Sequence, residues 1–111
     1  MSKSYDFSTF KSFIDATDAK GLAKEIKATK LSQANLQDIL NYAALMGDCE
    51  SIRVVLIAGA KATKKASDLA IKPSQNTGEG GHTMAGLYIK AILKNDISPK
   101  LTFSQIKIVP L

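Results

Sequence analysis

The sequence contains few of the residues that most often carry chemistry. It has a single cysteine, Cys49, and a single histidine, His82. One cysteine excludes an internal disulfide framework and a cysteine-rich zinc site, and it favours a reducing, cytoplasmic compartment. With one histidine and no HxxxH spacing, we expect no metal site and no cofactor. No two acidic residues have the spacing of a catalytic pair, since Asp15 and Asp18 are better explained as turn and cap residues.

Long apolar runs and arginines are also scarce. No run approaches the roughly 20 apolar residues that span a bilayer, so we expect no transmembrane segment. The N-terminal MSKSYDFSTF has no apolar stretch typical of a secretory signal. Arg53 is the only arginine. Because proteins that read nucleic acids usually rely on arginine for bidentate base contacts, its scarcity disfavours a nucleic-acid partner.

The charge is distributed unevenly along the 111 residues, whose net charge is +5. Residues 1–48 hold six lysines and six acidic residues, whereas residues 49–111 hold nine basic and four acidic residues. A basic half suits an acidic protein partner, a nucleic acid or an anionic membrane, and it also promotes solubility. The length and the 45% hydrophobic content are typical of one small soluble domain. We expect a helical domain over residues 1–98 and an extended tail over residues 99–111.

Hydrophobic spacing predicts an all-α fold of about six short helices in three antiparallel pairs. The pairs cover residues 7–29, 33–58 and 67–95. In each pair, apolar residues recur at the three- and four-residue spacing of one helical face. The residues expected to face inward are Phe7, Phe10, Phe13, Ile14, Leu22, Ala23, Ile26, Leu36, Ile39, Leu40, Ala43, Ile52, Val55, Leu56, Leu69, Ala70, Ile71, Met84, Leu87, Tyr88, Ala91 and Ile92.

Polar residues and prolines predict where the helices begin and end. The expected N-caps are Ser4 or Asp6, Asp18, Ser32, and Ser67 or Asp68. Pro73 should end the fifth helix, residues 74–81 form a loop by composition, and Asn95 ends the last helix. The alternating apolar residues of the tail leave two possibilities, packing on this domain or pairing with a partner's sheet edge.

The segment AALMGDCESIRVVLIAGA, residues 43–60, predicts two helices joined by a tight turn. Gly47 can end the first helix because glycine readily adopts positive φ, and Asp48 can cap the second. With its small pair Ala43-Ala44, Gly47-Asp48, Glu50, the apolar run at 52–56 and Gly59-Ala60, this segment resembles the helical core of an ankyrin repeat. The family's opening Thr-Pro-Leu-His is not kept at residues 38–41, and Ser51 stands where an apolar residue is usual. The flanking helix pairs would then be degenerate repeats, as terminal repeats commonly are.

The resemblance implies a binding scaffold. In the repeat pattern, Leu45 and Met46 occupy positions that face the concave binding side, and Tyr42 lies beside them. Exposed apolar residues rimmed by polar groups mark partner sites, and methionine and tyrosine suit them well. Three lysines of the following connection, Lys61, Lys64 and Lys65, would steer an acidic partner. Alternatively, the tail or the 74–81 loop covers Leu45 and Met46.

These observations predict a non-enzymatic protein-protein interaction module that binds and inhibits or regulates a partner with an acidic or mixed surface, without a small-molecule substrate. One alternative is a basic-surface binder of nucleic acid or anionic membrane. A second is a small enzyme that uses Cys49 with His82, since a cysteine at a helix start can have a lowered thiol pKa. A glycine-rich segment at 77–83 could also hold an anion, but it lacks a phosphate-loop motif.

Overall fold

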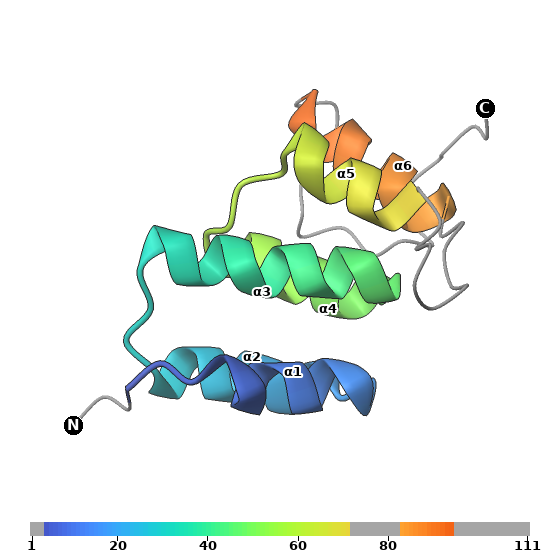
Figure 1. The fold of residues 1–111 in the computed structure, drawn as a ribbon. Helices are drawn as coiled ribbons and strands as arrows, with labels where there is room; N and C mark the ends of the chain where they lie inside the picture. The colour runs from blue at the N-terminus through green and yellow to red at the C-terminus, as the bar shows by residue number, and fades with distance from the viewer. Residues whose placement is uncertain (1–3, 72–82, 95–111) are drawn as a thin grey trace.

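The computed structural model describes residues 4–71 and 83–94, which form six α-helices. These are α1 (Phe7–Asp15), α2 (Ala19–Ala28), α3 (Gln33–Met46), α4 (Cys49–Ala58), α5 (Lys64–Ile71) and α6 (Thr83–Leu93). Figure 1 shows three antiparallel pairs stacked on one another, with α3 and α4 in the middle. The predicted all-α fold of about six short helices is therefore confirmed.

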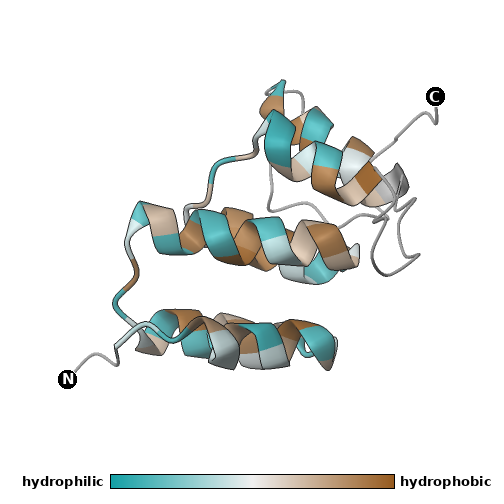
Figure 2. Ribbon diagram, in the orientation of Figure 1, coloured by the Kyte–Doolittle hydropathy of each residue, from teal (hydrophilic) through white to brown (hydrophobic). Residues whose placement is uncertain are grey.

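The stack has two layers. The first helices of the pairs, α1, α3 and α5, lie side by side in one layer, because α3 contacts both α1 and α5 (Figure 1). The second helices lie behind them, and α2 contacts α4 directly. Figure 2 shows that the helices carry hydrophilic and hydrophobic residues in separate stripes, as expected for helices that bury one face. One face of α3 is left without a covering helix, and this face contributes to the candidate site.

Four helices begin at N-caps that the sequence predicts. The carboxylates of Asp6, Asp18 and Asp48 accept hydrogen bonds from backbone N–H groups of Ser8, Gly21 and Ser51. Ser32 and Asn35 bond reciprocally to each other's backbone N–H, so that α3 begins with a capping box. These bonds satisfy N–H groups that lack a partner within the helix. Cap chemistry therefore fixes the starts of α1 to α4 locally.

The turns inside the first two pairs have the same geometry. Gly47 ends α3 with φ 71°, in the left-handed region, and its N–H bonds to the carbonyls of Ala43 and Ala44. Thr17, thirty residues earlier, occupies the equivalent turn with φ 53°. In both pairs an aspartate follows at once and caps the next helix. The two pairs therefore share a turn, although Thr17 lacks the conformational freedom of glycine.

The predicted start of α5 is wrong. The helix begins at Lys64, three residues before Ser67, because the Thr63 hydroxyl accepts a hydrogen bond from the N–H of Ala66 at 3.1 Å. Lys64 and Lys65 therefore belong to the first turn of α5 rather than to a connecting loop. Ser67 is fully buried, and its hydroxyl donates a bond to the carbonyl of Gly86 at 3.1 Å. This bond joins α5 to α6.

The core runs through all three pairs. Its buried hydrophobic residues are Phe10, Ile14, Leu22, Leu36, Ile39, Leu40, Ala43, Ala44, Ile52, Val55, Leu56, Ala60, Ala66, Ala70, Ala85, Tyr88 and Ile89. Ile89 is buried, although it was not expected to face inward. Several residues expected to face inward are only partly buried, namely Phe7, Phe13, Ala23, Ile26, Leu69, Ile71, Ala91 and Ile92. The predictions for Pro73, the 74–81 loop, His82, Asn95 and the 99–111 tail lie outside the described residues.

Candidate partner-binding groove

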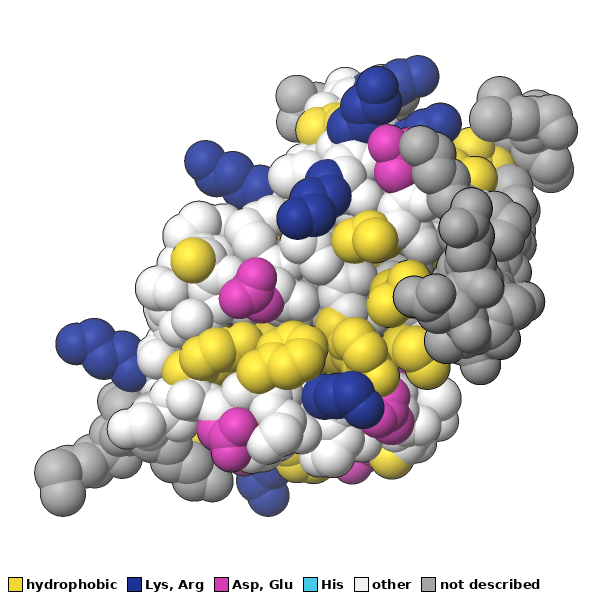
Figure 3. Space-filling view, in the orientation of Figure 1, with side chains coloured by type: hydrophobic (Ala, Val, Ile, Leu, Met, Phe, Trp, Pro, Cys, Tyr) yellow, Lys and Arg dark blue, Asp and Glu magenta, His cyan; other side chains and the backbone are white. Residues whose placement is uncertain are grey.

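An apolar groove opens on the front layer of the molecule. It has a volume of about 410 Å³, and its lining comes from the segment before α1, from α1, from α3 and from α5. The lining residues are Tyr5, Phe7, Asp38, Asn41, Tyr42, Leu45 and Leu69. Figure 3 shows a band of hydrophobic side chains across this face, framed by acidic and basic side chains. Such a framed apolar surface is typical of a protein-binding site.

Helical spacing explains why α3 supplies the centre of the groove. Asp38, Asn41, Tyr42 and Leu45 recur at three- and four-residue intervals and therefore share one face of the helix. The opposite side of α3 is buried through Ile39, Leu40 and Ala43. Leu45 is 37% exposed, a high value for a leucine in a helix whose other leucines are buried. The groove face is therefore the side of α3 that the fold leaves open.

Aromatic rings form one wall of the groove. Tyr5 stacks on the buried Phe10 with ring centroids 5.7 Å apart. Phe7 meets Tyr42 edge to face, also at 5.7 Å. Both geometries are those that aromatic pairs prefer. Since each groove ring contacts another ring, the wall is held in place by packing rather than left to the free rotation of single side chains.

The groove ends at a polar cluster formed by Tyr42, Asp15 and Lys11. The Tyr42 hydroxyl donates a hydrogen bond to the Asp15 carboxylate, which also accepts one from the Lys11 ammonium at 3.0 Å. The same ammonium lies 5.3 Å from the centre of the Tyr42 ring. The bonds from Tyr42 and Lys11 lower the pKa of Asp15, whereas burial and the bond to Asp15 raise the pKa of Tyr42. The cluster keeps Asp15 ionised and fixes the Tyr42 ring.

Two buried oxygens of the groove residues have no hydrogen-bond partner among the residues that the structure describes. They are the hydroxyl oxygen of Tyr5 and the amide oxygen Oδ1 of Asn41. Burial raises the pKa of Tyr5, and the negative charges of Asp38 and Asp6 raise it further. Most buried polar atoms in proteins are bonded, so such exceptions require an explanation. Sequence reasoning missed both residues because their proximity depends on the packing of separate segments.

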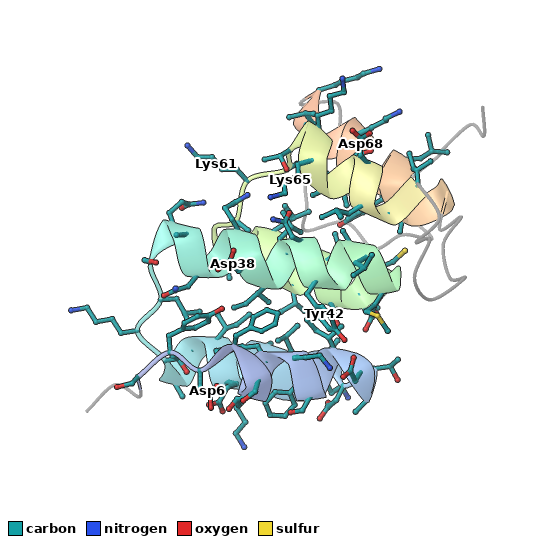
Figure 4. All side chains as sticks on the ribbon, viewed as in Figure 1. Asp6, Asp38, Tyr42, Lys61, Lys65 and Asp68 are labelled. Carbon is teal, nitrogen blue, oxygen red and sulfur yellow. The ribbon has the colours of Figure 1, made fainter. Side chains whose placement is uncertain are left out.

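The structure places the six predicted partner-binding residues in different surroundings. Tyr42 and Leu45 line the groove, whereas Met46 is partly buried against the core. Lys61, Lys64 and Lys65 are exposed, and Figure 4 shows Lys61 and Lys65 on the side of α3 that faces α5. The backbone of Lys61 is fixed by Gln37, whose amide bonds both its N–H and its carbonyl, at 2.6 and 3.0 Å. The role of these six residues stays a prediction.

A second groove lies in the other layer, between α2 and α4. It also has a volume of about 410 Å³, and it is lined by Ala23, Ile26, Lys27, Val54, Ile57 and Ala58. Ile57 is 45% exposed. The sequence contains a signal for this groove, because Val54 and Ile57 are apolar yet lie off the inward face marked by Ile52, Val55 and Leu56. None of the described residues that line this groove is aromatic or acidic.

The described surroundings of Cys49 disfavour its thiolate form. Burial and the neighbouring charges of Asp48 and Glu50 raise the pKa of its thiol, which is opposite to the lowering that a position at a helix start can cause. A raised pKa reduces the thiolate fraction, and the thiolate is the nucleophilic form. His82 lies outside the described residues, so the proposed Cys49–His82 pair is not tested. Within residues 4–71 and 83–94, no three His, Cys, Asp or Glu side chains gather in a way that could hold a metal ion.

Comparisons with known proteins do not identify a family. No protein-family model, no curated protein and no solved structure matches the chain. The resemblance to an ankyrin repeat therefore rests on the residues of segment 43–60. Among the described helices, none has both the length and the apolarity needed to cross a bilayer, and the longest of them, α3, has 14 residues.

Proposed function

We propose that this chain is a non-enzymatic protein-binding module that uses the front groove to bind a partner protein. The observation that carries the proposal is the exposed apolar groove across α1, α3 and α5, framed by charged side chains. Exposed apolar grooves of this kind bury partner side chains, and aromatic residues contribute strongly to binding energy. By covering a surface of the partner, the module inhibits or regulates it. The proposal includes the cytoplasmic location favoured by the single cysteine.

The charges around the groove support a partner with a mixed surface. Asp38 lies in the groove itself, and Asp15 lies at its end. The exposed Lys61 lies just before α5, and the exposed Lys64 and Lys65 lie in its first turn, so that they form a separate basic region. Figure 4 shows Lys61 and Lys65 in this region. Complementary charges on a partner would increase the association rate and fix its orientation. A partner that presents an apolar segment between basic and acidic residues fits this arrangement.

The arrangement of the helices supports an ankyrin-like version of the proposal. Helix pairs stack in register, and the turn at Gly47–Asp48 recurs at Thr17–Asp18. Stacked helix pairs with a common turn are the architecture of repeat proteins, in which neighbouring repeats bury a continuous core. In such proteins the layer of first helices forms an extended binding surface, which here corresponds to the face that carries the groove.

A capture experiment with matched variants tests the proposal. Wild type, Leu45→Asp and Ile57→Asp are used to capture proteins from the native cell lysate, and circular dichroism verifies that each variant is folded. Leu45 and Ile57 have similar exposure but lie on opposite layers. We expect a stoichiometric partner with wild type and Ile57→Asp that is lost with Leu45→Asp. Any enzymatic activity of that partner should fall when the wild-type module is added.

Two results would contradict the proposal. If wild type captures no protein at a stoichiometric ratio, the cells that supplied the lysate contain no protein partner for the groove. If the partner is retained by Leu45→Asp and lost with Ile57→Asp, binding occurs at the α2–α4 groove instead.

A further inference from the structure

The front groove contains two oxygen acceptors that none of the described residues supplies with a donor. The Asn41 amide oxygen and the Tyr5 hydroxyl oxygen are buried, and neither has a hydrogen-bond partner among the described residues. An unbonded buried oxygen destabilises a fold because it has lost water without gaining a partner. Both residues line the same groove, and because the two oxygens have almost no solvent exposure, a ligand can bond them only after the side chains turn toward the groove. A ligand that brings N–H donors would satisfy these oxygens.

The groove also carries the negative charge of Asp38. Asp38 lines it, is exposed and forms no ion pair with any other residue that the structure describes. Asp38 is close enough to Tyr5 to raise the pKa of the Tyr5 hydroxyl, which places the carboxylate and this hydroxyl in one electrostatic environment. A donor group with a positive charge is therefore favoured over a neutral one.

The aromatic wall favours a cation as well. Tyr5, Phe7 and Tyr42 line the groove, and the rings of tyrosine and phenylalanine attract cations through their faces. One such contact already exists at the end of the groove, where the Lys11 ammonium lies 5.3 Å from the centre of the Tyr42 ring. Lys11 is paired with Asp15, so it does not neutralise Asp38.

We propose that the groove, in its role as the partner-binding site, holds an arginine side chain of the partner protein. This inference rests on the proposed function. Arginine carries five N–H donors in a planar group, which can bond the Asn41 and Asp38 oxygens together while the plane stacks on an aromatic ring. A lysine ammonium is a more strongly hydrated point charge and stacks less well. An apolar residue beside the arginine contacts Leu45 and Leu69, at the apolar part of the groove.

The alternatives fit the groove less well. An anionic membrane would be repelled by Asp38 and Asp15, which lie on the same face. An acidic peptide would place carboxylates beside the same residues and would leave the Asn41 oxygen without a donor. The basic region at Lys61 and Lys65 lies to one side of the groove (Figure 4), where it can pair with an acidic residue that flanks the arginine.

Backbone-amide NMR of the complete chain with short peptides tests this inference. The probes are Ac-Leu-Arg-Leu-NH₂ and the same peptide with citrulline or lysine in place of arginine; citrulline has the shape of arginine but no charge. We expect the arginine peptide to shift the amides of Tyr5, Asp38, Asn41 and Leu45. Its affinity should exceed that of the citrulline peptide by about tenfold, the effect of a charge-assisted hydrogen bond. It should also exceed that of the lysine peptide, because an ammonium is more strongly hydrated and stacks less well on an aromatic ring.

Two substitutions and a matched control locate the interaction. Asp38→Asn and Asn41→Leu should each weaken binding of the arginine peptide by about tenfold. Asp38→Asn should leave the citrulline peptide unaffected. Glu50→Gln removes the same charge at the start of α4, in the other layer, and should change none of the affinities. The NMR spectra themselves show whether each variant remains folded.

Equal affinity for the arginine and citrulline peptides would overturn the inference, as would equal affinity for arginine and lysine. Shifts that lie outside the groove, or no shift at millimolar arginine peptide, would also overturn it. The outcome is separable from the proposed function. If a captured partner is lost with Leu45→Asp but kept with both Asp38→Asn and Asn41→Leu, the module binds through the groove without an arginine.

Discussion

The hydroxyl of Tyr42, in α3, donates a hydrogen bond to the carboxylate of Asp15, the last residue of α1. The two residues are 27 positions apart in the sequence, so the bond joins the first helix pair to the second. Lys11, one turn before Asp15, bonds the same carboxylate. Asp15 therefore has a structural role beyond that of the turn residue that the sequence predicted.

We expect Tyr42→Phe to destabilise the fold in a pH-dependent way. The loss at neutral pH should be about 1 kcal/mol, because the carboxylate is partly exposed and water screens the bond. The bonds from Tyr42 and Lys11 lower the pKa of folded Asp15. The stabilisation is therefore complete above the ordinary aspartate pKa of about 4 and disappears as the pH falls through the lowered value. Urea unfolding at several pH values measures this difference.

A double-mutant cycle with Asp15→Asn provides the control for Tyr42→Phe. If the hydroxyl acts through the carboxylate, the effects of the two substitutions will not add, and their coupling will weaken in acid. A loss of stability that is the same at pH 7 and at pH 3 would show that Tyr42 acts through packing alone.

Thr17 should be replaceable by glycine with a gain in stability. Thr17 is β-branched and has φ 53°, whereas the equivalent turn of the second pair uses Gly47. A side chain in the left-handed region costs about 1–2 kcal/mol, and glycine lowers this strain while it adds entropy to the unfolded chain. We therefore expect Thr17→Gly to raise the free energy of unfolding by about 1 kcal/mol, a net value smaller than the strain relieved. Thermal and urea unfolding measure the change.

Ala16 is the matched control for Thr17. It lies one residue earlier, with φ −84° and ψ 0°, in a conformation that alanine adopts readily. Ala16→Gly should therefore lower stability through unfolded-chain entropy alone. If both glycine variants lose stability, then the turn at Thr17 carries no strain that a glycine can relieve.

Local chemistry explains which parts of the fold the sequence could predict. Asp18, Ser32 and Asp48 cap helices because a short polar side chain reaches an N–H two or three residues ahead, and this reach depends on sequence spacing alone. The start of α5 was missed at Thr63. Lys64 and Lys65 follow Thr63 in the first turn of α5. Positive charge near a helix N-terminus interacts unfavourably with the helix dipole, so these lysines argue against a helix start at this position.

The candidate site was predictable only within one helix. Tyr42, Leu45 and Met46 were placed on one exposed surface by the repeat pattern, and of these Tyr42 and Leu45 line the groove. Tyr5 and Phe7 reach the groove because α1 packs beside α3, and Leu69 reaches it because α5 packs on the other side. Contacts between separate helices leave no mark in local spacing, so the aromatic wall could not be derived from the pattern. For the α2–α4 groove, only the α4 side was marked, by the apolar Val54 and Ile57 off the inward face.

Gly86 tests the close packing of α5 against α6. Alanine usually stabilises a helix interior by about 1 kcal/mol relative to glycine. At this position, however, a Cβ would overlap the Ile71 side chain and lie 3.2 Å from the Ser67 carbonyl oxygen. We expect the clash to outweigh the propensity, so that Gly86→Ala lowers the free energy of unfolding by about 1–3 kcal/mol. Combining Gly86→Ala with Ile71→Ala should recover part of that loss in urea unfolding. If Gly86→Ala alone is more stable than wild type, α5 and α6 can move apart enough to accommodate the Cβ.

Tyr5→Phe separates the stability of the fold from the binding of a partner. The ring of Tyr5 stacks on Phe10, and phenylalanine can keep this contact. The substitution removes a buried hydroxyl that has no partner among the described residues. We therefore expect the variant to be more stable than wild type by about 1 kcal/mol in urea unfolding.

The same substitution should weaken binding of the arginine peptide in the NMR titration, because the guanidinium loses one hydrogen-bond acceptor in the groove. A variant that is both less stable and unchanged in binding would mean that the Tyr5 hydroxyl is bonded within the free protein. Stability gained with binding lost is the pattern expected of a site that keeps an unsatisfied group for its ligand.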